Sequence, residues 1–107
     1  MFNLTDVELH PAGVMLDGVL TVRTAATVRS ALIEALTEHQ AVEVDCSAAE
    51  TIDLSLIQIL LAARLSARQQ GKQLTLAAPA AGVLRAVLER GGLLPPSGAD
   101  PFWSGHP

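Results

Sequence analysis

The feature that most constrains the fold is an uninterrupted run of helix-forming residues from 54 to 70. The run contains neither Gly nor Pro, the residues that most disfavour a helix interior, and Gly71 follows it as a C-terminal cap. Asp53 precedes the run, where its short side chain can accept hydrogen bonds from unpaired N–H groups of the first turn. The pattern predicts a helix of about four and a half turns with Ser55 in its first turn.

The two faces of this helix differ in character. At roughly 100° per residue, the face expected to meet the core collects Leu56, Ile57, Leu60, Ala63 and Ala67. Arg64 falls near this side, so its charged head is expected to reach solvent at an edge. The opposite face is a narrow strip of small or uncharged residues, namely Ser55, Gln58, Ala62, Ser66 and Gln69, with Ile59 and Leu65 on its borders. An exposed helix face ordinarily carries charges, so this strip indicates a surface that another molecule approaches closely.

Size and composition predict a single globular domain. With 107 residues, half of them apolar, the chain can bury roughly two thirds of its unfolded surface. Cys46 is the single cysteine and cannot form an internal disulfide. The net charge of −4, with dispersed Lys and Arg, argues against a nucleic-acid partner. No run reaches the roughly 18 apolar residues that span a bilayer, and the N-terminus lacks a signal-peptide pattern, so we expect a cytoplasmic protein without membrane insertion.

Hydrophobic periodicity predicts short strands and then a helix in the N-terminal part of the chain. Residues 7–10 and 14–16 alternate around a Pro-Ala-Gly turn and predict a β-hairpin. Residues 19–21 predict a further short strand. From Thr24 the period changes to 3.6, which predicts an amphipathic helix that ends near His39.

The C-terminal part predicts a crossover unit around the central helix. Strand candidates at residues 41–46 and 74–78 flank this helix, a spacing that predicts a right-handed βαβ unit with parallel strands. The loop between residue 46 and the central helix carries no strand pattern. A last helix is predicted to begin at Pro79 and to end at Gly91 and Gly92. The side chains expected to face the core from this helix are Val83, Leu84, Val87 and Leu88.

Residues 95–107 are rich in Pro, Gly and Ser and show no period. We therefore predict a domain of residues 1–94 followed by a C-terminal tail. The tail is expected to be mobile unless Phe102 and Trp103 dock. The sequence does not choose between docking on this domain and docking on another chain.

Side chains able to carry catalysis or bind a metal are not grouped in the sequence. His10, His39 and His106 lack the spacing of paired metal ligands, so we predict neither a metal nor another cofactor. Ser55 as a nucleophile would need a nearby His and an oxyanion site, and there is no Gly-x-Ser-x-Gly elbow or phosphate-binding glycine loop. We predict that the chain is not an enzyme. Cys46 is expected to be an inert buried thiol, and Asp45 to anchor a loop by a hydrogen bond.

The order of these segments resembles the STAS domain, the fold of anti-sigma factor antagonists and of the cytoplasmic ends of sulfate transporters. The resemblance covers about residues 5–94 and depends on the order and spacing of residues 17–21, 42–47, 52–55, 71–76 and 87–93. It implies an α/β fold in which a mixed β-sheet of four to five strands, with a β-hairpin at the N-terminus, is covered by three or four helices.

The resemblance also implies a site. In the family, the hydroxyl at the position of Ser55 is the phosphoacceptor of a partner kinase, and the loop and helix around it form the partner surface. This implies phosphorylation of Ser55 and a partner surface made of Asp53, Leu54, Ser55, Leu56, Gln58, Ile59, Ala62 and Ser66. Leu54 and Leu56 depart from the pattern, since the family usually has a small or hydroxyl residue before Ser55 and Gly after it. From the residues alone, we expect Asp53 to be a plain helix cap rather than a functional acid. Ser55 is either an ordinary first-turn serine or a residue that is phosphorylated or contacts the partner.

Three interpretations of the partner stay open. Residues 53–64 are similar to those of small STAS proteins of bacterial chemotaxis systems, which favours a signalling module that binds a kinase, an anti-sigma factor-like protein or a chemotaxis protein. The alternative is a STAS subunit bound constitutively to the ATPase of a lipid-transporting ABC system. The third is a homodimer through the apolar helix surface. The sequence identifies neither the partner nor any small ligand.

Overall fold

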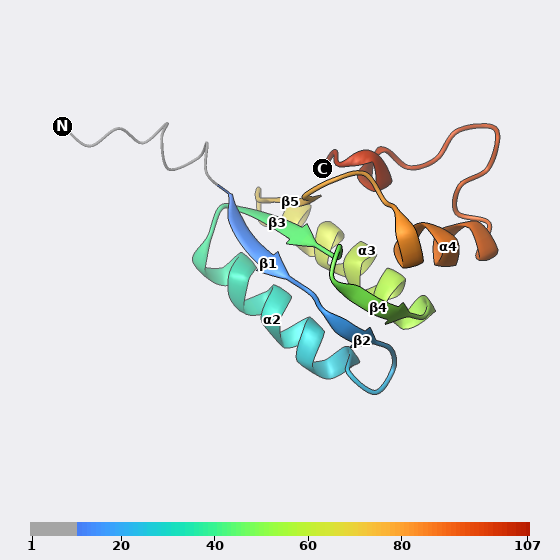
Figure 1. Ribbon diagram of the computed structural model, residues 1–107. Coiled ribbons are helices and arrows are strands. Elements are labelled where there is room, and N and C mark those ends of the chain that lie inside the picture. The colour runs from blue at the N-terminus through green and yellow to red at the C-terminus, as the bar shows by residue number, and fades with distance from the viewer. Residues whose placement is uncertain (1–10) are drawn as a thin grey trace.

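The computed structural model describes residues 11–107, in which single strands and pairs of strands are separated by helices. Within the described residues, three α-helices and five short strands are followed by one short 3₁₀ helix (Figure 1). The elements are β1 (Ala12–Met15), β2 (Gly18–Leu20), α2 (Ala25–Glu38), β3 (Ala41–Asp45), β4 (Ala49–Ile52), α3 (Leu54–Gln69), β5 (Gln73–Leu76), α4 (Gly82–Arg90) and η1 (Pro101–Ser104).

The strands form two small sheets in which all pairs within residues 11–107 are parallel. The first sheet has the order β1-β3-β5, and its register sets Val14 beside Val44 and Val44 beside Leu76. The second sheet pairs β2 with β4 and sets Val19 beside Thr51. Parallel neighbours need crossover connections, which α2 and α3 supply. The predicted βαβ unit of β3, α3 and β5 is therefore confirmed.

The core lies where the helices meet the sheets. α2 and α3 pack against each other and against strands of the first sheet, and α4 packs on β4 (Figure 1). In β3, Val42 and Val44 are buried while the residues between and beside them are half-exposed, because successive side chains of a strand point to opposite faces. The largest fully buried side chains are Phe102, Leu32, Leu56, Leu60, Leu74, Leu88, Val42 and Val44.

The predicted order of elements is confirmed from β1 onward, with one strand added. β4 occupies residues expected to form a loop, and it escaped detection because only Ile52 of its four residues is buried. β1 begins at Ala12, within the predicted turn. Residues 7–10, the first strand of the predicted hairpin, lie outside the described residues, and so does the antiparallel pairing that would make the sheet mixed.

The last helix begins later than predicted. α4 starts at Gly82 rather than at Pro79, and the N–H of Ala80 donates instead to the carbonyl of Trp103 at 2.8 Å. Leu84, Val87 and Leu88 are buried as predicted, but Val83 is exposed. The prediction for Val83 is wrong because the helix that carries it is shorter and turns this residue to solvent.

The C-terminal segment contributes to the core through two aromatic side chains. Phe102 is 0% exposed and Trp103 is buried beside it, with ring centroids 5.0 Å apart. The charged head of Arg64 does not reach solvent as predicted: the side chain is 12% exposed, and its Nη1 and Nη2 donate to the two carboxylate oxygens of Asp100, each at 2.6 Å. The guanidinium carbon lies 5.0 Å from the centre of the Phe102 ring. The division into residues 1–94 and a tail stays a prediction.

Candidate functional site

The start of α3 is built around the carboxylate of Asp53. Its Oδ1 accepts a hydrogen bond from the N–H of Ser55 at 2.8 Å, as predicted for an N-cap. Its Oδ2 accepts from the N–H of Val22 at 3.1 Å. One side chain thus joins the first turn of α3 to the loop between β2 and α2, and it fixes the backbone on which Ser55 lies.

The charge of Asp53 is stabilised by these bonds. Partial loss of hydration acts to raise the pKa of Asp53, but hydrogen bonds from the backbone of Val22, Ser55 and Leu56 outweigh it. The pKa of Asp53 therefore lies below its usual value. An ionised carboxylate stands next to the Ser55 hydroxyl at neutral pH.

The predicted partner residues separate into exposed and buried ones. Leu54 is 53% exposed, and Ser55 is half-exposed at the N-terminal end of α3. Further along the helix, Gln58 and Ala62 are exposed while Ile59 and Ser66 are half-exposed. Leu56 is only 1% exposed because it lies on the core face of the helix. Its side chain cannot belong to a partner surface, so that assignment is corrected. We call these exposed and half-exposed residues, Ser55, Gln58, Ala62 and Ser66, the outer strip.

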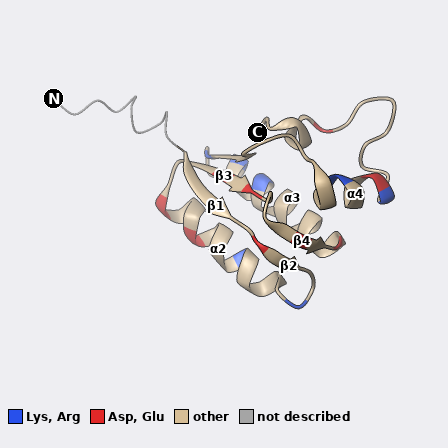
Figure 2. Ribbon diagram, in the orientation of Figure 1, with Lys and Arg blue, Asp and Glu red and all other residues tan. Residues whose placement is uncertain are grey.

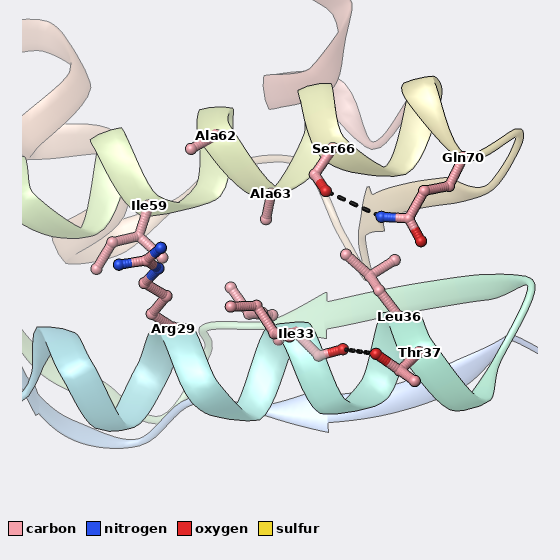
Figure 3. A pocket seen from close by; sticks show the side chains of 10 residues that line it. Arg29, Ile33, Leu36, Thr37, Ile59, Ala62, Ala63, Ser66 and Gln70 are labelled. Atoms are coloured by element: carbon pink, nitrogen blue, oxygen red, sulfur yellow. Dashed lines mark hydrogen bonds between the residues drawn. The ribbon is translucent and has the colours of Figure 1, made fainter.

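The outer strip borders a groove between α2 and α3 (Figure 3). The groove has a volume of about 190 Å³, and Arg29, Ile33 and Thr37 of α2 line one wall. The facing wall comes from α3 and includes Ala62 and Ser66. At one end, the side-chain amide of Gln70 donates to the hydroxyl of Ser66 at 3.0 Å. The sequence did not predict that α2 lines this groove, because its pattern is that of an ordinary amphipathic helix.

Val22 is a second residue of the site that the sequence analysis missed. Its side chain is 69% exposed, and it lies beside the site because Asp53 holds its N–H. The N–H of Asp53 in turn donates to the carbonyl of Leu20 at 3.2 Å, next to the pairing of β2 with β4. The sequence near Val22 does not predict that it lies close to Asp53, because this contact depends on β4, which has no visible strand pattern. Val22 and Leu54 are thus two exposed apolar side chains tied to Asp53.

Comparison with known proteins places this geometry in a family. The sequence profile of the family described as "Mlab, STAS domain" matches residues 4–94. The chain belongs to this STAS family. A solved structure described as "Crystal Structure Analysis of Mglu" is similar to this STAS domain with a TM-score of 0.55 and 19% identity, over 63% of this chain and 17% of that chain. At this identity the likeness concerns the fold alone. No curated protein matches the chain.

Membership in the family bears on what the site can do. STAS domains are generally non-catalytic modules that regulate or bind a partner, which agrees with the uncharged outer strip of α3. Of the helices between residues 11 and 107, none is long and apolar enough to cross a bilayer. Within the same residues, no three His, Cys, Asp or Glu side chains are grouped as metal ligands.

Two further residues of the STAS domain near the loop after β3 are structural. Asp45 accepts from the N–H of Ser47 at 2.8 Å, and the hydrogen bonds from the side chain and backbone of Ser47 hold the pKa of Asp45 below its usual value. The predicted loop anchor is confirmed. Burial, together with the charge of Asp45, raises the pKa of Cys46 to about 11, so the half-buried thiol stays protonated and unreactive at neutral pH.

Proposed function

We propose that this STAS domain binds a partner protein through the Asp53–Ser55 loop and the outer strip of α3. The observation that carries the proposal is a half-exposed hydroxyl at the start of a helix face that has no charged residue from Ser55 to Ser66. Removing a charge from water is a large free-energy cost in association. A partner helix or sheet can approach such a face without that cost. The exposed side chains of Leu54 and Val22 add apolar contact area beside the hydroxyl.

Phosphorylation of Ser55 would switch this binding. A phosphate adds roughly 1.5 to 2 negative charges at neutral pH. The N–H of Ser55 already donates to Asp53, so the phosphate would stand beside an ionised carboxylate without that donor to compensate it. The added charge would repel a partner packed on the outer strip unless that partner supplied Arg. A kinase, an anti-sigma factor-like protein or a chemotaxis protein is the partner class for this mode.

A second candidate is constitutive binding to the ATPase of a lipid-transporting ABC system. The matched family description names Mlab, and the resemblance noted above includes small STAS subunits that hold such an ATPase. The exposed side chain of Leu54 also lies directly before Ser55, where the family usually has a small or hydroxyl residue. This bulk restricts access to the hydroxyl while leaving the outer strip open to a permanent partner.

Capture of the partner from the source cell tests both candidates. The wild-type chain and an Ala62→Glu variant are used as baits, with Ala26→Glu as the matched control because Ala26 is an exposed alanine at the start of α2. We expect Ala62→Glu to lose the partner that the other two baits retain. Mass spectrometry then distinguishes a kinase or anti-sigma factor-like protein from an ABC ATPase, and it reads the phosphorylation of Ser55. Equal capture by all three baits would rule out the outer strip.

A further inference from the structure

A second hollow, of about 230 Å³, lies between the start of α3 and the last turn of α4. Asp53 and Leu54 line its α3 side, and Arg90 and Gly91 line its α4 side. The two sides come so close that a methyl group on the Cα of Gly91 would lie 3.4 Å from Cδ2 of Leu54. The end of α4 therefore adjoins the Asp53–Ser55 loop of the proposed partner surface.

The inner part of this hollow is apolar. The buried side chains of Ile52 and Val87 line it, and the exposed side chain of Leu54 adds apolar surface. Its volume is below the roughly 300–1,000 Å³ of sites that enclose a small molecule. A hollow of this size accepts one large apolar side chain, as do the pockets that hold anchor residues in protein interfaces.

Two charged side chains line the hollow, and they differ in what they can still bind. The carboxylate of Asp53 already accepts from the N–H groups of Val22 and Ser55. Arg90 is exposed and, in the part of the chain that the structure describes, forms no ion pair. Its guanidinium presents N–H donors in a planar fork that suits a carboxylate. The cation is therefore the more available of the two charges.

The other charged residues near Arg90 do not bind it. Arg85 and Glu89 pair with each other at 2.9 Å, so both signs of charge lie on α4 (Figure 2). Glu50 of β4 lines an adjoining hollow together with Arg90, but no ion pair joins the two. As a basic residue in the last turn, Arg90 suits the helix dipole. That role leaves its side-chain donors available to another molecule.

We propose that the partner inserts one large apolar side chain into this hollow and pairs a neighbouring aspartate or glutamate with Arg90. This inference rests on the proposed function and adds to it the chemistry of the partner segment. It also extends the partner surface from α3 to the end of α4. A phosphate on Ser55 would repel an acidic segment, so phosphorylation weakens binding in this arrangement.

Charge changes at Arg90 test the acidic half of the proposal. Calorimetric titration with the purified captured partner compares the full wild-type chain with Arg90→Glu, Arg90→Gln and Arg85→Glu. Arg90→Glu should weaken binding by roughly tenfold or more, because like charges then meet, and Arg90→Gln should weaken it less. Arg85→Glu makes the same change of charge on the same helix but outside the hollow, so it should bind within about threefold of wild type.

Gly91→Ala tests the apolar half. The added methyl group narrows the hollow beside Leu54 and should weaken binding by roughly threefold or more. The φ angle of Gly91 is −83°, which alanine adopts freely, so the variant is expected to fold. Thermal unfolding checks this for every variant. Arg90→Gln also avoids placing an acidic side chain at the C-terminal end of α4, where the helix dipole disfavours it.

The results separate this inference from the proposed function. Arg90 variants that bind like wild type overturn the acidic segment, and so does tighter binding by Arg90→Glu. Wild-type affinity of Gly91→Ala overturns the apolar anchor. Loss of binding in Ala62→Glu, with none in Arg90→Glu or Gly91→Ala, would leave the outer strip as the partner surface and remove the hollow from it. The opposite result would support the hollow and rule out the outer strip.

Discussion

At the scale of single residues, the carboxylate of Asp53 joins two parts of the chain that lie 31 positions apart. The sequence predicted its bond to the first turn of α3, because capping is a local property of a helix start. It did not predict the bond to Val22, which depends on the pairing of β2 with β4. The proposed partner surface is therefore organised by a residue whose second contact is visible only in the fold.

The pH dependence of stability should report these bonds. Because the pKa of Asp53 is lowered, its contribution is present above the pKa of the unfolded chain, near 3.8, and is lost as the pH falls through the lower folded-state value. We expect wild type to be more stable than Asp53→Asn at neutral pH, and the difference to shrink in acid. Urea unfolding of both proteins measures it. Asp45 and Asp100 titrate in both and cancel, so a difference independent of pH would contradict the account.

Substitution of Ser55 separates charge from size. Ser55→Asp places a negative charge at the start of the outer strip and should weaken binding of the captured partner by roughly tenfold or more. Ser55→Ala removes only the hydroxyl and should bind within about threefold of wild type, since the net worth of one exposed hydrogen bond is small. Calorimetric titration of both variants gives the comparison. Equal affinities would mean that charge at Ser55 does not control binding.

At the scale of elements, the C-terminal segment with η1 is held by contacts of several kinds. Asp100 caps η1 by accepting from the N–H of Phe102 at 3.0 Å, and it pairs with Arg64 of α3. The hydrogen bond and charge of Arg64, helped by the bond from Phe102, hold the pKa of Asp100 below its usual value against the effect of burial. η1 also contacts β5. The segment therefore completes the core beyond the residues that the family profile matches.

Removing one of its aromatic side chains should be costly. Phe102→Ala is expected to lower the free energy of unfolding by about 3–5 kcal/mol, because it leaves a cavity among buried side chains. Ser104→Ala, at an exposed position of the same element, should stay within about 0.5 kcal/mol of wild type. Urea unfolding measures both. Similar stability of the two variants would show that η1 is not part of the cooperative core.

The sequence predicts the elements that have a clear period and misses those that do not. α2 and α3 follow from residues that recur every three to four positions, and β3 follows from alternation. β4 does not, since only Ile52 marks its buried side. The ion pair of Arg64 with Asp100 spans 36 positions and depends on tertiary packing, so helical position alone assigned Arg64 to solvent. The outer strip was predicted, whereas its neighbours Val22 and Arg29 come from other elements.

At the scale of the whole molecule, two surfaces share α3. The start of the helix, with Asp53 and Ser55, is the proposed partner site, and the groove with α2 lies further along the same helix. They overlap at Ala62 and Ser66, which border the groove. Because one helix lines both surfaces, a molecule seated in the groove would compete with a partner that covers the whole outer strip.

Hydrogen–deuterium exchange of the chain with and without its captured partner tests the central claim most directly. The account predicts slower exchange at backbone amides of residues 53–66 and of the loop at Val22 when the partner is bound. η1, which packs on β5, should exchange as in the free chain. Protection confined to α4 or η1, with residues 53–66 unchanged, would contradict the proposed partner surface.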